Sequence, residues 1–317
     1  MHPTLRSTWE TFLGSIPPDR LRYVATRLLK DGILRIPGVA AFDSQRHARN
    51  TGGMFDPDEA SLLLAGHVQR LLEHGGELGH LRAIEIGPGN SLAQALILIL
   101  LGAERVTAVD VREYATEENG GGVYGRVVKE LEGWVETGRF ASSIGAGERK
   151  QRSREFLPHG ARFPTLGGAL QYEITDGVRI PLGDDSCNFA YSVSVLEHVG
   201  DVGATYREMA RILEPGSLMS HIIDLRDHHH PEPHDFLRYE DGLWSRMQGR
   251  SAGFTNRLRA SDHLSLLEKA GFEILEVRQK DAERAPQKKD LASRFHPYEE
   301  ADLKALTLIV VAKLTNR

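Results

Sequence analysis

The sequence predicts an α/β protein with a mostly parallel sheet, and three features support this fold class. Short apolar runs of strand length recur between residues 81 and 314, and helical patterns separate them. Two glycines, Gly87 and Gly89, follow the first of these runs and precede a helical pattern. The chain has 317 residues, which is enough to bury a full core with additions. We therefore expect one α/β domain with extensions rather than two independent domains.

The glycine turn joins a predicted strand, residues 81–86, to a predicted helix, residues 92–101. Glycines suit this turn because the chain must reverse sharply and let a ligand approach the backbone. The amides at the start of the helix, with Asn90 or Ser91 as the expected N-cap, offer donors and the positive end of the helix dipole. The turn is therefore a predicted site for a nucleotide-like ligand.

Residues around the turn indicate the kind of ligand. Leu92 stands where a dinucleotide-binding turn has its third glycine. Glu85 precedes the turn, where a carboxylate would repel a pyrophosphate but attract a cation. The next predicted strand, residues 105–111, ends on Asp110, which is placed to accept both hydroxyls of a ribose. These residues disfavour a dinucleotide and suit a cationic ligand.

The turn and the next strand resemble the first two motifs of the class I S-adenosylmethionine-dependent methyltransferases. The resemblance rests on Glu85-Ile86-Gly87-Pro88-Gly89 together with Asp110. It extends to the family's fourth motif in residues 194–199 and to a helix that ends before Pro215-Gly216. Ser91 departs from the family, which has a further glycine there. The resemblance implies a Rossmann-like, seven-stranded, mostly parallel sheet with an antiparallel last strand, and S-adenosyl-L-methionine as the methyl donor.

The resemblance also implies which residues bind the cofactor. Asp176 follows a predicted strand, residues 170–175, and would accept a hydrogen bond from the adenine amino group. The alternative is that Asp176 only caps the backbone of its own turn. The cofactor-binding residues that the resemblance implies are Glu85, Gly87, Pro88, Gly89, Asp110, Val111, Asp176, Gly177, Ser192 and Val193.

Residues 1–58 are predicted to form an N-terminal helical extension, and residues 59–317 the methyltransferase domain. Within the extension, residues 49–55 carry a glycine pair and form either a plain linker or a lid over the cofactor. Two insertions, residues 112–169 and 226–260, are expected to form a substrate cap. Long insertions in compact domains are commonly functional, and ligands of α/β folds lie at the carboxyl ends of the strands.

Further elements are expected around these insertions. The basic, glycine-broken run at residues 147–154 is expected to be a solvated face. The other predicted helices are residues 20–30, 58–72 and 124–135, one that ends at Pro215-Gly216 and one that begins near Ser261. The other predicted strands are residues 187–193, 217–225, 272–280 and 306–314.

The most unusual local composition lies in residues 224–235, which are rich in histidine and carboxylate side chains. This segment is a polar loop, a source of a general base, or a divalent-metal site made of Asp224, Asp227 and a histidine. An imidazole, with an ordinary pKa of about 6.5, can accept the proton of a hydroxyl group as the methyl group is transferred. We favour a base without a metal. The candidate catalytic residues, which follow the predicted fourth and fifth strands, are His198, His228 and His229.

These features predict O-methylation of a small molecule, with a sugar or a secondary metabolite as the acceptor. A hydroxyl acceptor needs a base more than an amine does. N- or C-methylation of a small molecule, a nicotinamide-dependent oxidoreductase and a non-catalytic cofactor-binding subunit stay open as alternatives. Leu92 and the expected antiparallel last strand disfavour the oxidoreductase.

Composition argues against several other classes of protein. The net charge of -5 disfavours a nucleic acid partner, because phosphate binding relies on clustered positive charge. The single cysteine, Cys187, excludes a disulfide framework and suits a reducing cytosol. No apolar run approaches the about 20 residues that cross a bilayer, and the N-terminus lacks a signal-peptide core. We expect a cytoplasmic enzyme without membrane or nucleic acid partners, and its oligomeric state stays open, with a homodimer as one option.

Overall fold

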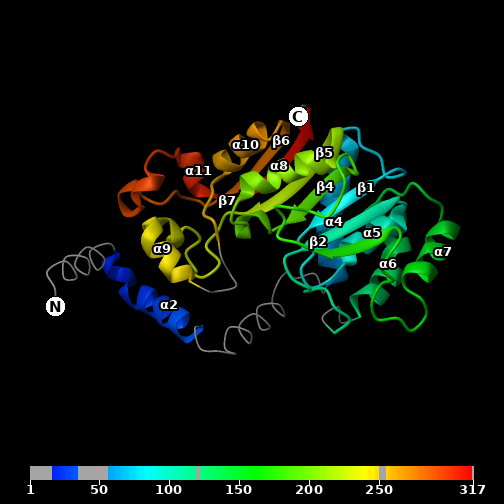
Figure 1. Ribbon diagram of the computed structural model, residues 1–317, viewed down its shortest axis with the longest axis horizontal. Coiled ribbons are helices and arrows are strands. Elements are labelled where there is room, and N and C mark those ends of the chain that lie inside the picture. Colours follow the sequence, from blue (N-terminus) through cyan, green and yellow to red (C-terminus); the bar gives the residue numbers. More distant parts are fainter. Residues whose placement is uncertain (1–15, 35–55, 119–121, 250–254, 316–317) are drawn as a thin grey trace. The chain divides into compact units, whose positions relative to one another are not determined.

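The computed structural model describes residues 16–34, 56–118, 122–249 and 255–315 (Figure 1). The predicted lid or linker, residues 49–55, lies outside the described residues.

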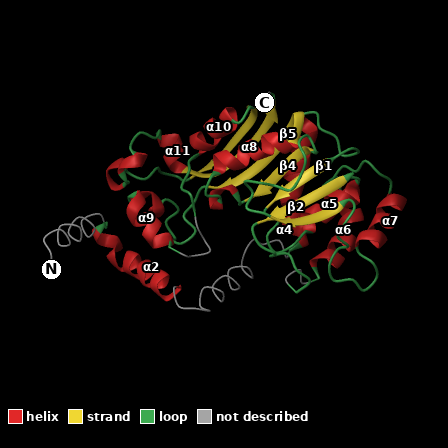
Figure 2. Cartoon of the chain, in the orientation of Figure 1, coloured by secondary structure: helices red, strands yellow, loops and turns green. Residues whose placement is uncertain are grey.

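A seven-stranded sheet organises the described chain (Figure 2). Its strands are β1 (Arg82–Ile86), β2 (Arg105–Asp110), β3 (Leu170–Ile174), β4 (Cys187–Val193), β5 (Leu213–Asp224), β6 (Phe272–Asp281) and β7 (Ala305–Leu314). The strand order is β3-β2-β1-β4-β5-β7-β6. Every neighbouring pair from β3 to β5 is parallel.

Strand β7 runs antiparallel to both of its neighbours. The Leu225 N–H, just after β5, donates to the carbonyl of Leu306 near the start of β7, at 2.9 Å. The Thr315 N–H, just after β7, donates to the carbonyl of Gly271, just before β6, at 3.1 Å. Each bond joins the end of one strand to the beginning of another, as antiparallel pairing requires. The predicted sheet with an antiparallel last strand is therefore confirmed.

The chain divides into two compact units. Unit 1 consists of residues 1–47, 224–261 and 279–307, and unit 2 of residues 48–223, 262–278 and 308–317. Unit 2 holds β1 to β4 and all of the predicted cofactor-binding residues, whereas unit 1 holds the segment that follows β5. Among the residues that the structure describes, no helix is both long enough and apolar enough to span a membrane.

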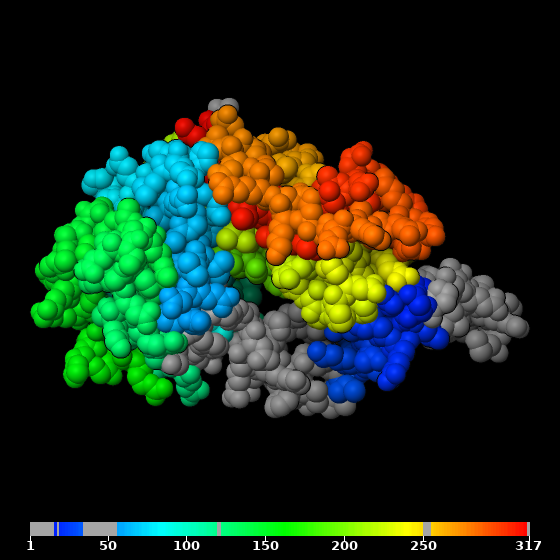
Figure 3. Space-filling model, turned by 180° about the vertical axis from the view of Figure 1, so that it is seen from behind, coloured from blue at the N-terminus to red at the C-terminus, as the bar shows by residue number. Residues whose placement is uncertain are grey.

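Helices lie on both faces of the sheet in unit 2 (Figure 1). They are α4 (Pro57–Glu73), α5 (Ala93–Leu101), α6 (Val123–Glu136), α7 (Ala146–Phe156), η2 (Leu196–His198), α8 (Val202–Ile212) and most of α10 (Ala260–Lys269). Ser220 and His221 are consecutive in β5 and therefore point to opposite faces. The Ser220 hydroxyl bonds Nδ1 of His67 on α4 at 2.8 Å, whereas the His221 ring lies 6.2 Å from that of Tyr206 on α8. Figure 3 shows α4 beside the surface of α6 and α7.

Unit 1 has its own apolar core. Its helical elements are η1 (Pro18–Arg20), α2 (Leu21–Leu34), η3 (Asp235–Arg238), α9 (Asp241–Gln248), η4 (Lys288–Asp290), η5 (Ser293–Phe295) and α11 (Glu300–Lys304). Helices α2 and α9 pack side by side, and Figure 3 shows them as adjoining dark blue and yellow surfaces. Buried side chains from four of these elements meet there, namely Val24, Phe236, Trp244 and Phe295.

The basic run that we expected to be a solvated face forms helix α7. Arg149 is buried and donates to both carboxylate oxygens of Glu132 on α6, at 2.8 and 2.6 Å. Arg152 donates to the carbonyls of Ile99 and Ala103 at the end of α5, at 3.0 and 2.9 Å. Carbonyls in the last turn of a helix have no partner within that helix. The expectation holds for the exposed Lys150 and Arg154. It is wrong for Arg149 and Arg152, because contacts with distant residues, which a local pattern does not reveal, hold these two side chains.

Strand β5 begins earlier than predicted. It starts at Leu213, so Pro215 and Gly216 lie inside the strand rather than before it. The pairing of β4 with β5 shifts its register in this region, and Gly216 adopts a φ of 87°, which glycine tolerates. Proline and glycine mark a local irregularity of the strand here.

The start of α5 also differs from the prediction. The helix begins at Ala93, and its N-cap is Leu92 rather than Asn90 or Ser91. The hydrogen bond that the Ser91 hydroxyl accepts from the Ala93 N–H is long, at 3.4 Å. The Leu92 N–H donates instead to the hydroxyl of Tyr124 on α6, at 3.1 Å. A residue of the insertion therefore supplies the oxygen atom at the start of this helix.

Candidate active site

The carboxyl ends of four parallel strands meet at one edge of the sheet in unit 2. In the registers of the three strand pairs, Ile86 lies opposite both Val109 and Ser192, and Asp110 lies opposite Ile174. All of the predicted cofactor-binding residues lie within the last two residues of these strands or directly after them, so they share this edge. Ligands of open α/β sheets bind outside the carboxyl ends of the strands.

The glycine turn after β1 has the strained backbone that its sequence predicts. Gly87 and Gly89 adopt φ values of 68° and 65°, in the left-handed region that favours glycine. The Gly87 N–H donates to the carbonyl of Val109 at 2.8 Å. A Cβ atom on Gly87 would lie 2.4 Å from Cγ2 of Val195, so a side chain would also clash. Pro88, between the two glycines, is buried.

Asp110 holds the glycine turn through its carboxylate. One oxygen accepts from the Gly89 N–H at 3.2 Å and the other from the Val111 N–H at 2.7 Å. Burial raises the pKa of Asp110 to about 6, although these backbone hydrogen bonds oppose the shift. The Val111 side chain beside it is exposed. A carboxylate at the end of β2 is suited to accept two ribose hydroxyls.

Glu85 lies beneath the turn and is almost fully buried, with 4 % of its surface exposed. Burial raises its pKa to about 8; the neighbouring Tyr191 hydroxyl lowers it, and the negative charge of Asp110 raises it further. Glu85 in turn raises the pKa of Tyr124, whose own burial is the larger cause. Sequence reasoning missed both tyrosines, because they approach Glu85 only through strand pairing and through packing of α6.

The residues that follow β3 form a local turn. Asp176 is exposed, and its Oδ1 accepts from the N–H groups of Val178 and Arg179, at 3.0 and 3.1 Å. These backbone hydrogen bonds lower the pKa of Asp176 and form the local turn that we weighed as an alternative role. Gly177 follows with a φ of 73°. A bond from Asp176 to adenine stays a prediction.

Ser192, the second-to-last residue of β4, is buried. Its hydroxyl lies 2.7 Å from Nδ1 of His221 on the adjacent β5. Val193 is partly exposed, and Ser194 after it adopts a φ of 52°. This left-handed residue turns the chain sharply into η2, where His198 lies partly exposed. The end of β4 therefore presents the segment 193–198 at the same edge as the glycine turn.

His228 in unit 1 lies beside a carboxylate at the end of β5. Its Nε2 is 3.4 Å from Oδ2 of Asp224. Arg226 donates to both oxygens of the same carboxylate, at 2.9 and 2.6 Å. Burial alone would raise the pKa of Asp224, but hydrogen bonds from Arg226 and His228 lower it well below its ordinary value. Asp224 therefore stays ionised and can orient the imidazole of His228.

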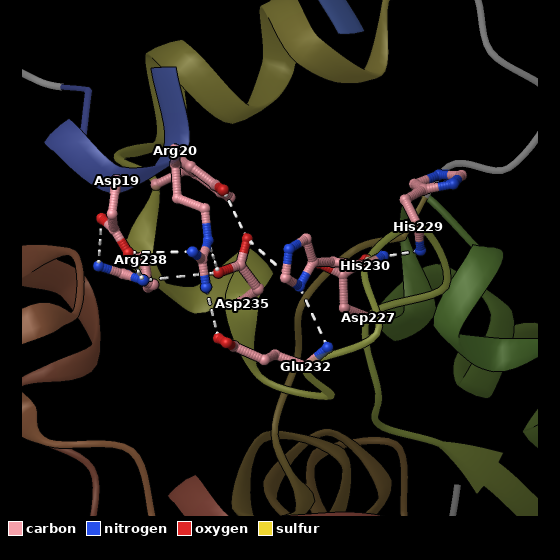
Figure 4. A network of polar contacts seen from close by, with 9 residues as sticks. Asp19, Arg20, Asp227, His229, His230, Glu232, Asp235 and Arg238 are labelled. Carbon is pink, nitrogen blue, oxygen red and sulfur yellow. Dashed lines mark hydrogen bonds and ion pairs between the residues drawn. The ribbon is translucent and has the colours of Figure 1, made fainter. Parts of the chain in front are cut away.

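The backbone around the histidines is held in a compact loop. Oδ1 of the buried Asp227 accepts from the N–H groups of His229 and His230, at 2.7 and 3.1 Å. The Asp227 N–H donates to the carbonyl of Pro233 at 2.7 Å. Nδ1 of His230 accepts from the Glu232 N–H at 3.1 Å. Figure 4 shows the His229 ring directed away from His230 and from the charged groups around it.

The charged groups around this loop form an ion-pair network within unit 1 (Figure 4). Arg20 donates to the buried carboxylate of Asp235 at 2.7 Å and to Glu232 at 2.6 Å. Arg238 pairs with Asp19 at 3.0 Å. Ligand atoms of His230, Glu232 and Asp235 lie within 4.8 Å of one another, as in a metal site. Arg20 already pairs with both carboxylates, and Nη1 of Arg238 lies 3.7 Å from Oδ1 of Asp235, so we assign this cluster as an ion-pair network.

The metal ligands weighed from the sequence are engaged in other contacts. Asp224 binds Arg226 through both oxygens, and Oδ1 of Asp227 accepts two backbone hydrogen bonds. The three candidate histidines belong to different units, His198 to unit 2 and His228 and His229 to unit 1. Of the two candidate histidines in unit 1, His228 is the one whose described contacts include Asp224.

Comparison with known proteins identifies the family. The family model described as "Methyltransferase domain" matches residues 21–277. The chain is 28% identical over 120 residues to the O-methyltransferase cnsE of Penicillium expansum, and 29% identical over 110 residues to the O-methyltransferase resE of Aspergillus sclerotiorum. These matches cover 38% and 34% of this chain, and 39% and 38% of the two relatives.

Solved structures with a similar fold include methyltransferases of low sequence identity. An S-adenosylmethionine-dependent methyltransferase from Mesorhizobium loti is 18% identical with a TM-score of 0.42, over 77% of this chain and 96% of that one. The geranyl diphosphate C-methyltransferase of Streptomyces coelicolor is 11% identical with a TM-score of 0.45, over 79% and 76% of the two chains. The family match, together with the strand order and the antiparallel last strand, confirms the resemblance found in the sequence. The chain therefore belongs to the methyltransferase-domain family and is of the class I, S-adenosylmethionine-dependent type.

Proposed function

We propose that this protein transfers the methyl group of S-adenosyl-L-methionine to a hydroxyl oxygen of a small molecule, with His228 as the general base. The observation that supports this proposal most directly is the contact between Nε2 of His228 and Oδ2 of Asp224, 3.4 Å, at the carboxyl end of β5. Hydroxyl groups are weak nucleophiles until they lose their proton, so an oriented imidazole has a use in O-methylation. A sugar or a secondary metabolite is the proposed acceptor.

The reaction is an in-line displacement at the methyl carbon. The acceptor oxygen forms a bond to this carbon as the carbon–sulfur bond breaks, and its electrons return to sulfur. The hydroxyl proton passes to His228. Because Asp224 accepts from Nε2–H, the imidazole adopts the tautomer in which Nδ1 accepts the proton. The products are the methyl ether and neutral S-adenosylhomocysteine, and the imidazolium then loses its proton to solvent.

The cofactor would be held by the edge of unit 2. Asp110 would accept from the ribose hydroxyls, the backbone of Gly87 to Gly89 would allow close approach, and Glu85 would offset the positive charge of the cofactor. The cofactor supplies an activated methyl group, so the protein mainly aligns donor and acceptor and removes one proton. Asp176 and Gly177, with Ser192 and Val193, are the proposed adenine side of this site.

Two relatives named O-methyltransferases support a hydroxyl acceptor, although the matches reach less than half of either chain.

The proposed domain boundaries follow the prediction, with residues 1–58 as an extension and residues 112–169 and 226–260 as the parts that cover the acceptor.

A methyl-transfer assay on the full chain tests this proposal. The protein is incubated with S-adenosyl-L-methionine labelled in the methyl group and with a panel of phenols, sugars and amines, and labelled products are identified by mass spectrometry. We expect label on hydroxyl oxygen. The variant His228→Ala should lower turnover by about 10² to 10⁴ fold with nearly unchanged cofactor affinity. Asp224→Asn should lower it by about tenfold or more, since Asp224 only orients the base.

Matched variants separate the base from a general loss of histidine. His80→Ala alters an exposed residue before β1, at the opposite edge of the sheet, and should leave turnover unchanged. His198→Ala and His229→Ala test the other two candidates. Label on amine nitrogen alone, or a wild-type rate for His228→Ala, would contradict the proposed base. Loss of activity with a chelator would favour a metal.

A further inference from the structure

We propose that Glu85 is protonated at neutral pH in the protein without cofactor, and that it releases this proton to solvent when S-adenosyl-L-methionine binds. This inference rests on the proposed function, because it requires a cationic cofactor at the glycine turn. It makes cofactor binding dependent on pH through one carboxyl group that lies outside the chemical step.

The geometry around Glu85 disfavours an isolated charge. The carboxyl is almost fully buried on β1, a strand in the interior of the sheet, and its Oε2 has no hydrogen-bond partner among the described residues. An ionised carboxylate without partners for both oxygens is costly to bury, whereas a neutral carboxyl is tolerated. A group in this position takes up a proton unless a cation approaches.

The groups that face Glu85 come from every element packed around it. Asp110 on β2 is a second carboxyl group, and its negative charge disfavours ionisation of Glu85. Tyr191 on β4 places its hydroxyl beside Glu85, and the amide of Ala95 on α5 is the other donor that stabilises the charge. Tyr124 on α6 lies close enough for the charge of Glu85 to raise its pKa. The Tyr191 phenol and the Ala95 amide offset only part of the cost of burial.

The histidine beside Tyr191 carries no charge at neutral pH. His67 on α4 lies beside Tyr191, with ring centroids 5.4 Å apart. Burial lowers the pKa of His67 far below its ordinary value, and Arg70 and His221 add to this shift. His67 is therefore neutral at pH 7 and supplies no positive charge to Glu85. The surroundings as a whole raise the pKa of Glu85 to about 8.

The pKa of Glu85 determines how much proton the protein releases when the cofactor binds. With a pKa of about 8, most Glu85 side chains carry a proton at pH 7. A bound cation favours the ionised form, so its binding expels this proton. Because the pKa of this acid is raised in the protein without cofactor, affinity increases as the pH rises towards 8 and levels off above it. The increase approaches tenfold per pH unit between about pH 6 and 7, and it is about fivefold between pH 7 and 8.

Calorimetry on the full-length protein tests the inference. S-adenosyl-L-methionine is titrated into the protein at pH 7 in two buffers with different ionisation enthalpies, and the difference in heat gives the number of protons released. The wild-type protein should release close to one proton more than Glu85→Gln, whose side chain has the shape of a protonated glutamate. The comparison also removes the titration of the cofactor's own amino group, which has an ordinary pKa of about 8.

The pH series adds a second readout. The dissociation constant of the wild-type protein should fall steeply between pH 6 and 8, and that of Glu85→Gln should change much less over this range. Asp110→Asn is a graded comparison: it removes a negative charge that raises the pKa of Glu85 but leaves the carboxyl buried, so this variant should bind more weakly and release less of a proton than the wild type, yet more than Glu85→Gln. If Glu85→Gln does not fold or bind, infrared difference spectra of the wild-type protein replace it, and binding should remove a protonated carboxyl band.

The outcomes separate this inference from the proposed function. Binding of S-adenosyl-L-methionine with equal proton release in the wild type and Glu85→Gln, or with no loss of a protonated carboxyl band, overturns the inference and leaves the proposed function standing. Failure of the wild-type protein to bind S-adenosyl-L-methionine overturns both. Methyl transfer to a different acceptor atom would contradict the proposed function without touching the proton release.

Discussion

The substitution Gly87→Ala should destabilise unit 2 by two additive effects. Gly87 adopts a φ of 68°, and an alanine in the left-handed region costs about 1 to 2 kcal/mol. The added Cβ would also lie 2.4 and 2.8 Å from the two methyl carbons of Val195, so rotation of the valine gives no relief. Overpacking of this kind costs about 1 to 3 kcal/mol. We expect a total loss of about 2 to 5 kcal/mol in the free energy of unfolding.

Equilibrium unfolding in urea measures this loss, and two further variants divide it. Gly75 has a φ of 84° with open space where a Cβ would lie, so Gly75→Ala reports the backbone effect alone. Val195→Ala combined with Gly87→Ala should restore part of the loss, with a coupling of about 1 to 2 kcal/mol between the two sites. Equal losses for Gly87→Ala and Gly75→Ala, without coupling to Val195, would refute the clash.

Two further predictions concern groups away from the turn. Arg152→Ala removes the donors to the carbonyls at the end of α5 and should cost about 1 to 3 kcal/mol by urea unfolding, whereas the exposed Arg154→Ala in the same helix should cost little; equal effects would argue against this capping. Burial lowers the pKa of His221 to about 3, so the unfolded chain binds a proton between about pH 6.5 and 3 that the folded chain does not, and stability should fall with decreasing pH by up to about 1.4 kcal/mol per unit. His221→Asn, which keeps a polar partner for Ser192, should flatten this dependence in unfolding experiments across pH, and an unchanged slope would assign it to other groups.

Local sequence patterns predicted those strands and helices whose formation depends on residues close to one another in the chain. The run before Gly87, the apolar helix after it and the strand that ends on Asp110 are all short-range patterns, and each forms within a residue or two of its predicted bounds. Helix α7 was missed as a structural element because its basic side chains gain their partners from α5 and α6. The start of β5 was misplaced because Pro215-Gly216 is typical of a break, whereas the strand accommodates it with a register shift.

The candidate site divides in the same way. Motif residues such as Asp110 were predictable because a carboxylate at the end of β2 follows directly from the order of residues. The surroundings of Glu85 were not, because Tyr124 and Tyr191 are far from it in sequence and reach it only after the sheet has formed. The contact between His228 and Asp224 is local, and the spacing of four residues could have indicated it.

All nine residues of α5 are buried, and the helix has no polar face that could meet water. Such a helix depends on its neighbours for solubility. Helices α6 and α7 pack against it, and Ser142 and Arg152 bond its last carbonyls. The described part of the insertion at residues 112–169 therefore belongs to the hydrophobic interior. A shortened version of this protein, trimmed to the strands and helices that all members of the fold need, would require α5 to be redesigned with polar residues before it could be kept in solution.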